Sequence, residues 1–169
     1  MKLLEPKVID NFYSESKRQK IIDTLRSFPK SYWDYDSEFK RYRLHHPYIN
    51  KLAMLEMDRA REEFNNPDLL FTYALACLYN DNGSTLKKHK DNNACTYTID
   101  ICLTSKKPWP LFIEGVPYSL DSNGAVLFYG EDQLHWREDI EEGNSVLMLF
   151  MHFADRDHWW FQANNKECI

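Results

Sequence analysis

The hydrophobic pattern of the chain changes near residue 68, and this change limits the folds that it can adopt. Before that point, apolar residues recur at helical spacing over residues 15–28 and again from about residue 50 to residue 64. After it, short apolar runs of β type are separated by turn signals. The strand candidates are residues 69–79, 96–103, 111–114, 125–129, 135–137 and 145–153. The pattern predicts an α+β, mainly β fold: a double-stranded β-helix (jelly roll) with two N-terminal helices packed on one sheet.

The domain organisation is expected to be simple. A length of 169 residues suits one hydrophobic core, and the sequence contains no linker, internal repeat or low-complexity segment. We therefore expect a single domain over residues 1–169, with a helical part at about 14–65 and a jelly-roll core at about 68–155. Residues 30–49 are aromatic and charged, and no regular structure is assigned to them.

The composition argues against several classes of function. A net charge of -5 disfavours a dedicated nucleic-acid binder, which needs a basic face to displace counterions from phosphates. Residues 1–7 are interrupted by charge and proline, and no apolar run approaches the roughly 18 residues of a membrane span. We therefore expect a cytoplasmic protein without membrane attachment. The four cysteines form no CxxC pair, which favours reduced thiols over a zinc or disulfide framework.

A His-x-Asp tripeptide provides the first candidate for chemistry. His89 and Asp91 stand at positions i and i+2, so on a strand both side chains point to the same face. His135 lies 44 residues after Asp91, and in a jelly roll a distant strand can return beside the first. Two histidines and one carboxylate on one side of an iron form the facial triad, which leaves positions open for a co-substrate and oxygen. A chance His-x-Asp on a solvated loop is the competing interpretation.

Longer motifs around these residues resemble a known enzyme family. Residues 79–91 are similar to the Tyr-x-x-x-Gly-x-x-x-x-x-His-x-Asp motif of the prolyl-4-hydroxylase-like branch of Fe(II)- and 2-oxoglutarate-dependent dioxygenases. Residues 98–103 resemble the next strand of that family, and residues 123–135 resemble its approach to the distal histidine. The likeness covers about residues 8–155.

This resemblance implies a hydroxylase that binds Fe(II) and 2-oxoglutarate and uses O2 as its co-substrate. It implies that His89, Asp91 and His135 hold the iron, and that Tyr79 donates its hydroxyl group to 2-oxoglutarate. Thr98, on the strand that follows the motif, is expected to bind the same co-substrate. A peptide is the usual substrate of this family, and a small molecule is the alternative. The choice between them stays open because the loops that select the substrate are the part of a fold that a sequence describes least.

The chain departs from the family at the residue that clamps the far carboxylate of 2-oxoglutarate. Asn144 and Ser145 stand where the family normally has Arg or Lys. Arg137 is two residues past His135, so on a strand it shares the inward face. Its guanidinium can bind a carboxylate in fork geometry, and we therefore expect Arg137 to act as the clamp.

Two alternatives to this clamp stay open. Arg137 is equally consistent with a surface residue that pairs with Glu138 or Glu142. If it is a surface residue, Lys106 and Lys107 are the next candidates for the cation.

Strand alternation also singles out an acidic residue. Thr98, Asp100 and Cys102 share one face of the predicted strand, opposite the isoleucines between them. If that face looks into the barrel, Asp100 is a candidate for binding a cationic substrate group or for pairing with Arg137. The competing interpretation is a solvated carboxylate at a strand edge.

Two classes of function therefore compete. The first is a Fe(II)- and 2-oxoglutarate-dependent hydroxylase of a peptide or small-molecule substrate. The second is a cupin-like metal-binding protein or enzyme, in which the same three ligands hold another divalent ion without 2-oxoglutarate. The missing Arg or Lys clamp is the feature that favours the second.

Overall fold

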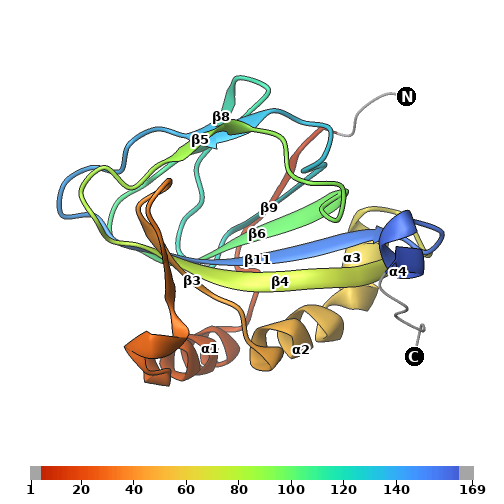
Figure 1. Ribbon diagram of the computed structural model, residues 1–169, viewed down its shortest axis with the longest axis horizontal. Coiled ribbons are helices and arrows are strands. Elements are labelled where there is room, and N and C mark those ends of the chain that lie inside the picture. The colour runs from red at the N-terminus through yellow and green to blue at the C-terminus, as the bar shows by residue number, and fades with distance from the viewer. Residues whose placement is uncertain (1–4, 164–169) are drawn as a thin grey trace.

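Two antiparallel sheets make up most of the molecule, which a computed structural model describes over residues 5–163 (Figure 1). The larger sheet has seven strands in the order β1-β9-β6-β11-β4-β3-β2, and the smaller has four in the order β5-β10-β7-β8. Every strand pair in both sheets is antiparallel. Neighbouring strands are mostly distant in the chain, so residues far apart in the sequence meet between the sheets.

The bounds of the elements are as follows. The larger sheet consists of β1 (Lys7–Ile9), β2 (Asp34–Asp36), β3 (Arg41–Leu44), β4 (Leu69–Tyr79), β6 (Tyr97–Ser105), β9 (Ala125–Phe128) and β11 (Val146–Asp155). The smaller sheet consists of β5 (Leu86–His89), β7 (Leu111–Ile113), β8 (Val116–Tyr118) and β10 (His135–Arg137). The helices are α1 (Glu15–Ser27), the 3-10 helix η1 (Lys30–Tyr32), α2 (Pro47–Leu55), α3 (Met57–Glu63) and α4 (Trp159–Ala163).

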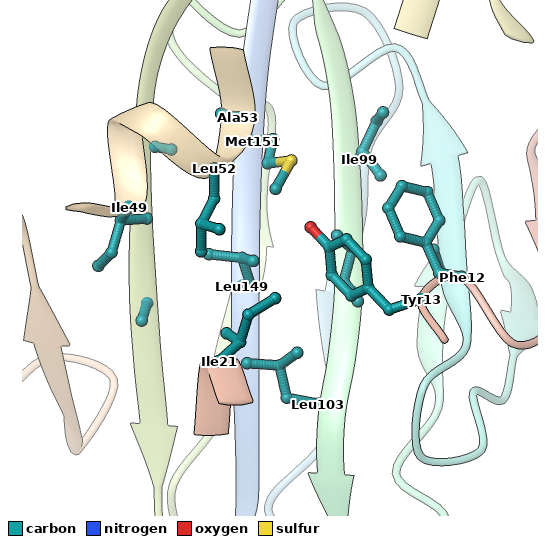
Figure 2. Close-up of a cluster of buried hydrophobic side chains, with 14 of the residues drawn as sticks. Phe12, Tyr13, Ile21, Ile49, Leu52, Ala53, Ile99, Leu103, Leu149 and Met151 are labelled. Carbon is teal, nitrogen blue, oxygen red and sulfur yellow. The ribbon is translucent and has the colours of Figure 1, made fainter. Parts of the chain in front are cut away.

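Helices α1, α2 and α3 cover the outer face of the seven-stranded sheet (Figure 1). Helix α1 begins after Ser14, whose hydroxyl oxygen accepts a hydrogen bond from the backbone N–H of Lys17 at 3.3 Å. Its apolar face joins that of α2 in a buried cluster on the sheet. Figure 2 shows Ile21 of α1, Ile49 of α2 and Leu149 of β11 within this cluster. Burial of this apolar surface fixes the helices on one side of the sheet.

The opposite face of the larger sheet looks toward the smaller sheet. Along β4, Ala74 and Ala76 belong to the cluster under the helices, whereas Cys77 and Tyr79 belong to a second cluster between the sheets. The second cluster also contains Ile113 of β7 in the smaller sheet. The period-two alternation of the strands therefore decides which side chains enter the space between the sheets.

Residues 30–49 contain a strand pair that was not predicted from the sequence. Strands β2 and β3 pair at the edge of the larger sheet, and β3 pairs with β4. Strand β3 was not predicted because Arg41 and Arg43 occupy its face toward the smaller sheet, where a strand normally carries apolar residues. Strand β8, which follows a turn with Gly115 at φ 84°, was also not predicted.

The second predicted helix, residues 50–64, is divided in two and begins earlier than expected. Helix α2 starts at Pro47, and the Nδ1 atom of His46 accepts a hydrogen bond from the backbone N–H of Tyr48 at 3.1 Å. At Glu56 the backbone leaves helical geometry (φ −92°, ψ 4°), and α3 begins at the next residue. The Glu56 carboxylate binds Lys17 of α1 at 2.6 Å, a long-range contact that helical periodicity does not reveal.

The observed architecture agrees with the coarse prediction of a mostly β fold with helices on one sheet. Each of the described helices lacks the length and hydropathy of a membrane span.

Candidate metal centre

Strand pairing in the smaller sheet brings the two predicted histidine ligands together. Strand β10 pairs with β5 so that His135 lies opposite His89, with ring centroids 4.3 Å apart. Asp91 follows the end of β5 in a loop, where its backbone N–H donates to the carbonyl oxygen of Gly130 at 2.9 Å. One ligand atom from each of the three predicted metal ligands lies within 4.8 Å of the other two.

Backbone carbonyl groups fix the orientation of both imidazole rings. The Nδ1 atom of His89 lies 2.7 Å from the carbonyl oxygen of Lys87. The Nδ1 atom of His135 lies 2.9 Å from the carbonyl oxygen of Gln133. Because a carbonyl oxygen only accepts, each Nδ1 carries a hydrogen, and a neutral ring then presents the lone pair of Nε2 to a metal. The two Nε2 atoms lie 3.3 and 3.5 Å from the Oδ1 atom of Asp91.

The charge state of these groups suits a cation. Burial opposes ionisation of Asp91, but hydrogen bonds from His135 and His89 outweigh it and hold the pKa of Asp91 well below its usual range. Burial also disfavours the charged form of His135, but the contact with Asp91 outweighs it and raises the pKa of His135. A divalent metal binds in place of such a shared proton. Two imidazoles and a carboxylate are a suitable donor set for a divalent first-row metal.

Gly130 leaves room for the carboxylate in this arrangement. A Cβ atom at this position would collide with the Asp91 carboxylate and would lie 2.6 Å from the Oγ1 atom of Thr98. The backbone of Gly130 is not left-handed, so the close approach of these groups explains the glycine. Thr98 itself contacts the Nδ1 atom of His152 at 3.2 Å, and the collisions of a Cβ atom at Gly130 place its hydroxyl group near the Asp91 carboxylate.

A second group of potential ligands shares Asp91 with the first. Cys95 and His152 have ligand atoms within 4.8 Å of Asp91 and of each other. The Sγ atom of Cys95 lies 2.9 Å from the hydroxyl oxygen of Tyr73. Burial raises the pKa of the Cys95 thiol well above its ordinary value and lowers the pKa of His152 to about 4. Because a protonated thiol is a poor ligand, the first group is the better metal centre.

A cavity of about 170 Å³ opens beside the three candidate ligands. Besides the ligands, its wall carries Asp100 from β6 and the basic residues Arg41, Arg43 and His45 from β3 and the residue that follows it. These basic residues were not predicted as part of the site, because residues 30–49 could not be assigned regular structure from their sequence. Their spacing at every second position is the signal that could have identified them.

Tyr79 lies at the end of β4 with its side chain fully buried between the sheets. Its hydroxyl oxygen accepts a hydrogen bond from the Nη1 atom of Arg41 at 2.7 Å. The Nε atom of Arg41 donates to the Oδ2 atom of Asp36 at 3.1 Å. The hydroxyl proton of Tyr79 is therefore available to a further acceptor.

Arg137 is buried and only 3% exposed, which excludes the interpretation as a surface residue. Its Nη1 atom donates to the carbonyl oxygen of Trp109, while its Nε and Nη2 atoms have no hydrogen-bond partner within residues 5–163. Asp100 is also 3% exposed and lies on β6, a central strand, so it is not at a sheet edge. Burial raises the pKa of Asp100 to about 7, although the charge of Arg137 acts against this rise.

Asn144, one of the two positions where the dioxygenases of the resemblance normally have Arg or Lys, binds the backbone of a neighbouring loop in this chain. The side-chain amide of Asn144 accepts from the backbone N–H of Lys107 at 3.0 Å and donates to the carbonyl oxygen of Lys107 at 3.1 Å. The Nζ atom of Lys107 lies 3.0 Å from Glu141 at the surface, and Lys106 is exposed as well. Neither lysine lines the cavity.

Comparison with known proteins identifies the fold. No family model and no curated protein matches the sequence. A Pseudomonas putida prolyl-4-hydroxylase matches with a TM-score of 0.71 at 16% identity, over 89% of this chain and 92% of that chain. HygX from Streptomyces hygroscopicus, with nickel, 2-oxoglutarate and hygromycin B bound, matches with a TM-score of 0.68 at 13% identity, over 90% and 83%.

A third solved structure is a Trichoplax adhaerens prolyl hydroxylase in complex with a hypoxia inducible factor peptide fragment. It matches with a TM-score of 0.66 at 12% identity, over 88% of this chain and 83% of that chain. At such identities the likeness establishes the fold, which this chain shares with 2OG-Fe(II) oxygenases.

Proposed function

We propose that the protein is a non-haem Fe(II)- and 2-oxoglutarate-dependent dioxygenase, a hydroxylase of a peptide or a small molecule. One observation carries the proposal: the Nε2 atoms of His89 and His135 converge on the same oxygen of Asp91, at 3.3 and 3.5 Å, on the wall of a cavity. Three protein ligands on one side of a metal leave its other positions facing the cavity, as a facial triad requires.

The chain has groups that suit a dianionic co-substrate as well as the metal. Arg137 is a buried guanidinium whose Nε and Nη2 atoms lack partners among the described residues, and a carboxylate would satisfy both. Tyr79 lies within the same cluster between the sheets as Trp109, over whose ring the Arg137 guanidinium is centred at 4.9 Å. We assign the far carboxylate of 2-oxoglutarate to Arg137 and a hydrogen bond from Tyr79 to the same molecule. Thr98, which contacts His152, would bind nearer the metal.

When bound, iron and 2-oxoglutarate would supply the oxidising chemistry, with succinate and carbon dioxide as by-products. The chain's own residues orient the ligands and exclude water. Buried Phe128 packs against the His135 ring with centroids 4.9 Å apart, and Phe150 lines the same cavity. These two aromatic side chains exclude water from their side of the candidate site.

The fold supports a finer structural proposal. We infer that the two facing antiparallel sheets form a double-stranded β-helix within a single oxygenase domain, with a helical part at about residues 14–65 and a jelly-roll core at about 68–155. Two of the matching proteins have a small molecule or a peptide bound, namely hygromycin B and a hypoxia inducible factor fragment. They support a substrate of one of these two kinds.

Two observations favour a second candidate, a cupin-like metal protein that does not use 2-oxoglutarate. Asn144 holds a loop instead of supplying charge, and Asp100 places a carboxyl group in the cavity, where it would repel a dianion when ionised. Burial raises the pKa of Asp100 to about 7, so the neutral form is well populated near neutrality and the repulsion is then absent.

Anaerobic titration with Fe(II), with and without 2-oxoglutarate, tests the proposal. We expect a visible metal-to-ligand charge-transfer band only when both are present. Iron binding without that band, or binding of another divalent ion in place of iron, would support the cupin-like candidate. Absence of any divalent metal binding would contradict both.

A further inference from the structure

Strand β3 supplies a row of basic side chains to the cavity. Arg41, Arg43 and His45 stand at alternate positions and all three line the cavity beside the candidate metal ligands. Leu44, between them, is fully buried in the cluster under the helices. The alternation therefore turns the basic face of this edge strand inward and its apolar face outward toward the helices.

The acids near this row do not balance its charge inside the cavity. The Asp36 carboxylate pairs with both guanidinium groups. Its Oδ2 atom lies 3.1 Å from the Nε atom of Arg41 and 3.8 Å from the Nε atom of Arg43. Asp34 lies opposite Arg43 in the strand register, but it is exposed and does not line the cavity. One carboxylate shared by two guanidinium groups leaves a positive surplus at the cavity wall.

The other acids on the wall are engaged elsewhere. Asp91 contacts the two candidate histidine ligands. Asp100 lies on β6, which is separated from β3 by β11 and β4 in the sheet. Within the described part of the chain, Asp36 is the carboxylate that pairs with Arg43.

The two arginines of the row occupy different depths. Arg41 is 12% exposed and is bound to Tyr79, at the end of the cluster that contains Trp109. Arg43 is 39% exposed, yet its Nε atom is buried and makes no hydrogen bond among the described residues. His45 is exposed at the next inward position. Arg43 and His45 are thus the members of the row that a molecule entering from solvent meets first.

We propose that Arg43 and His45 bind an anionic group of the substrate, a carboxylate or a phosphate, at the open side of the metal cavity. The inference rests on the proposed function and adds the chemical class of its substrate. The exposed part of the Arg43 guanidinium group binds either oxyanion by charge-assisted hydrogen bonds, and the imidazole adds a further donor. Arg137 and Tyr79 remain assigned to the co-substrate.

Nuclear magnetic resonance of the Zn(II)-loaded protein saturated with 2-oxoglutarate tests the inference, because zinc is diamagnetic and supports no turnover. Inorganic phosphate and acetate are titrated separately while the backbone amide signals of β3, which the wild type and Arg43→Gln share, are followed. We expect a saturable shift with at least one anion and about a tenfold or greater loss of affinity in Arg43→Gln, the size expected for a lost hydrogen bond between charged groups. Arg156→Gln, at an exposed arginine that pairs with Asp68, is the matched control and should bind like the wild type.

The outcomes separate the inference from the proposed function. Phosphate binding with a weak response to acetate indicates a phosphorylated substrate, and the reverse indicates a carboxylate. If neither anion gives a saturable shift, or if Arg43→Gln binds like the wild type, the inference is wrong. If 2-oxoglutarate itself fails to bind, the proposed function fails, and the same titration in its absence still reports on Arg43.

Discussion

His135 lies directly opposite His89 across the antiparallel pair β5 and β10, and both rings direct Nε2 to one oxygen of Asp91. This relationship depends on two features that are independent of each other: the register of a short strand pair and the carbonyl groups that hold each Nδ1 atom. The fold should tolerate the loss of any one of these three side chains, because the hydrophobic cluster under the helices contains none of them.

We predict that His89→Ala, Asp91→Ala and His135→Ala each abolish iron retention and leave the fold intact. Each change removes one of three ligands, while the cluster under the helices contains none of them. Metal analysis of the purified variants and their circular dichroism measure the two effects. Asp58→Ala, at an exposed aspartate, is the control and should retain iron. Normal iron content in one of the three variants would remove that residue from the site.

We predict that Gly130→Ala loses metal affinity through a steric effect. The added methyl group collides with the Asp91 carboxylate and crowds Thr98, so the carboxylate must move. Gly115→Ala provides the contrast, because that position has open space but a left-handed backbone with φ of 84°. It should lose about 1–2 kcal/mol of stability through backbone strain alone and still bind iron normally. Equal metal affinity in Gly130→Ala and the wild type would show that the loop relaxes around the methyl group.

The proximity of His89 and Asp91 could be predicted from the sequence because it depends on local spacing, whereas His135 joins them through the register of β5 and β10. The His-x-Asp pair needed only a strand that ends near His89, and the structure has such a strand, although Asp91 itself lies just beyond it. The helices and the longer strands were predictable for a similar reason, since their hydrophobic patterns are long and regular.

The rest of the cavity could not be predicted because it depends on sheet register. His152 reaches the metal centre only because β11 pairs with β6, which sets it opposite Thr98. Arg41 reaches Tyr79 only because β3 joins the edge of β4. Such pairings between distant segments produce no periodic pattern in the sequence. In β3 the inward-facing residues are arginines, so the strand also lacks the apolar alternation by which a strand is predicted.

We predict that Asp100→Asn becomes more stable relative to the wild type as pH rises. Burial raises the pKa of Asp100 to about 7 in the folded protein, against an ordinary value of 3.8. Between these values the folded state keeps a proton that the unfolded state releases, so the free energy of unfolding falls as pH rises, by at most about 4 kcal/mol. Urea unfolding of both metal-free proteins from pH 4 to pH 8 measures the difference.

Exposed Asp139→Asn serves as the control for replacing a carboxylate by an amide at the surface. A difference between Asp100→Asn and the wild type that does not change with pH would mean that folding does not shift the pKa of Asp100 from its ordinary value.

We predict that Tyr79→Phe weakens 2-oxoglutarate binding without changing iron binding. The phenol hydroxyl is free to donate because its oxygen already accepts from Arg41, and losing a hydrogen bond to a charged group costs about 1.5–3 kcal/mol. The Michaelis constant for 2-oxoglutarate and the iron content of the variant measure the two effects. Tyr35→Phe, which removes an exposed hydroxyl bound to Asp81, is the control. An unchanged Michaelis constant would place the co-substrate away from Tyr79.

The last prediction concerns Arg137, where the chain departs from the enzymes that it resembles. A dianionic co-substrate in a narrow cavity needs a cation at the end remote from the metal, because a desolvated and unpaired carboxylate is strongly unfavourable. Asn144 carries no charge and holds the backbone of Lys107, whereas Arg137 is buried with two nitrogen atoms unpartnered in the described structure.

Arg137→Met should therefore lose nearly all affinity for 2-oxoglutarate, and Arg137→Lys should keep part of it, since lysine supplies charge but not the planar two-pronged contact. Both variants should bind iron, because Arg137 is not a ligand in this scheme. Anaerobic titration of 2-oxoglutarate into the Fe(II)-loaded variants decides the matter, with exposed Arg156→Met as the control. Wild-type affinity in Arg137→Met would contradict the assignment and leave Arg41, which is bound to Tyr79, as the cation for the co-substrate.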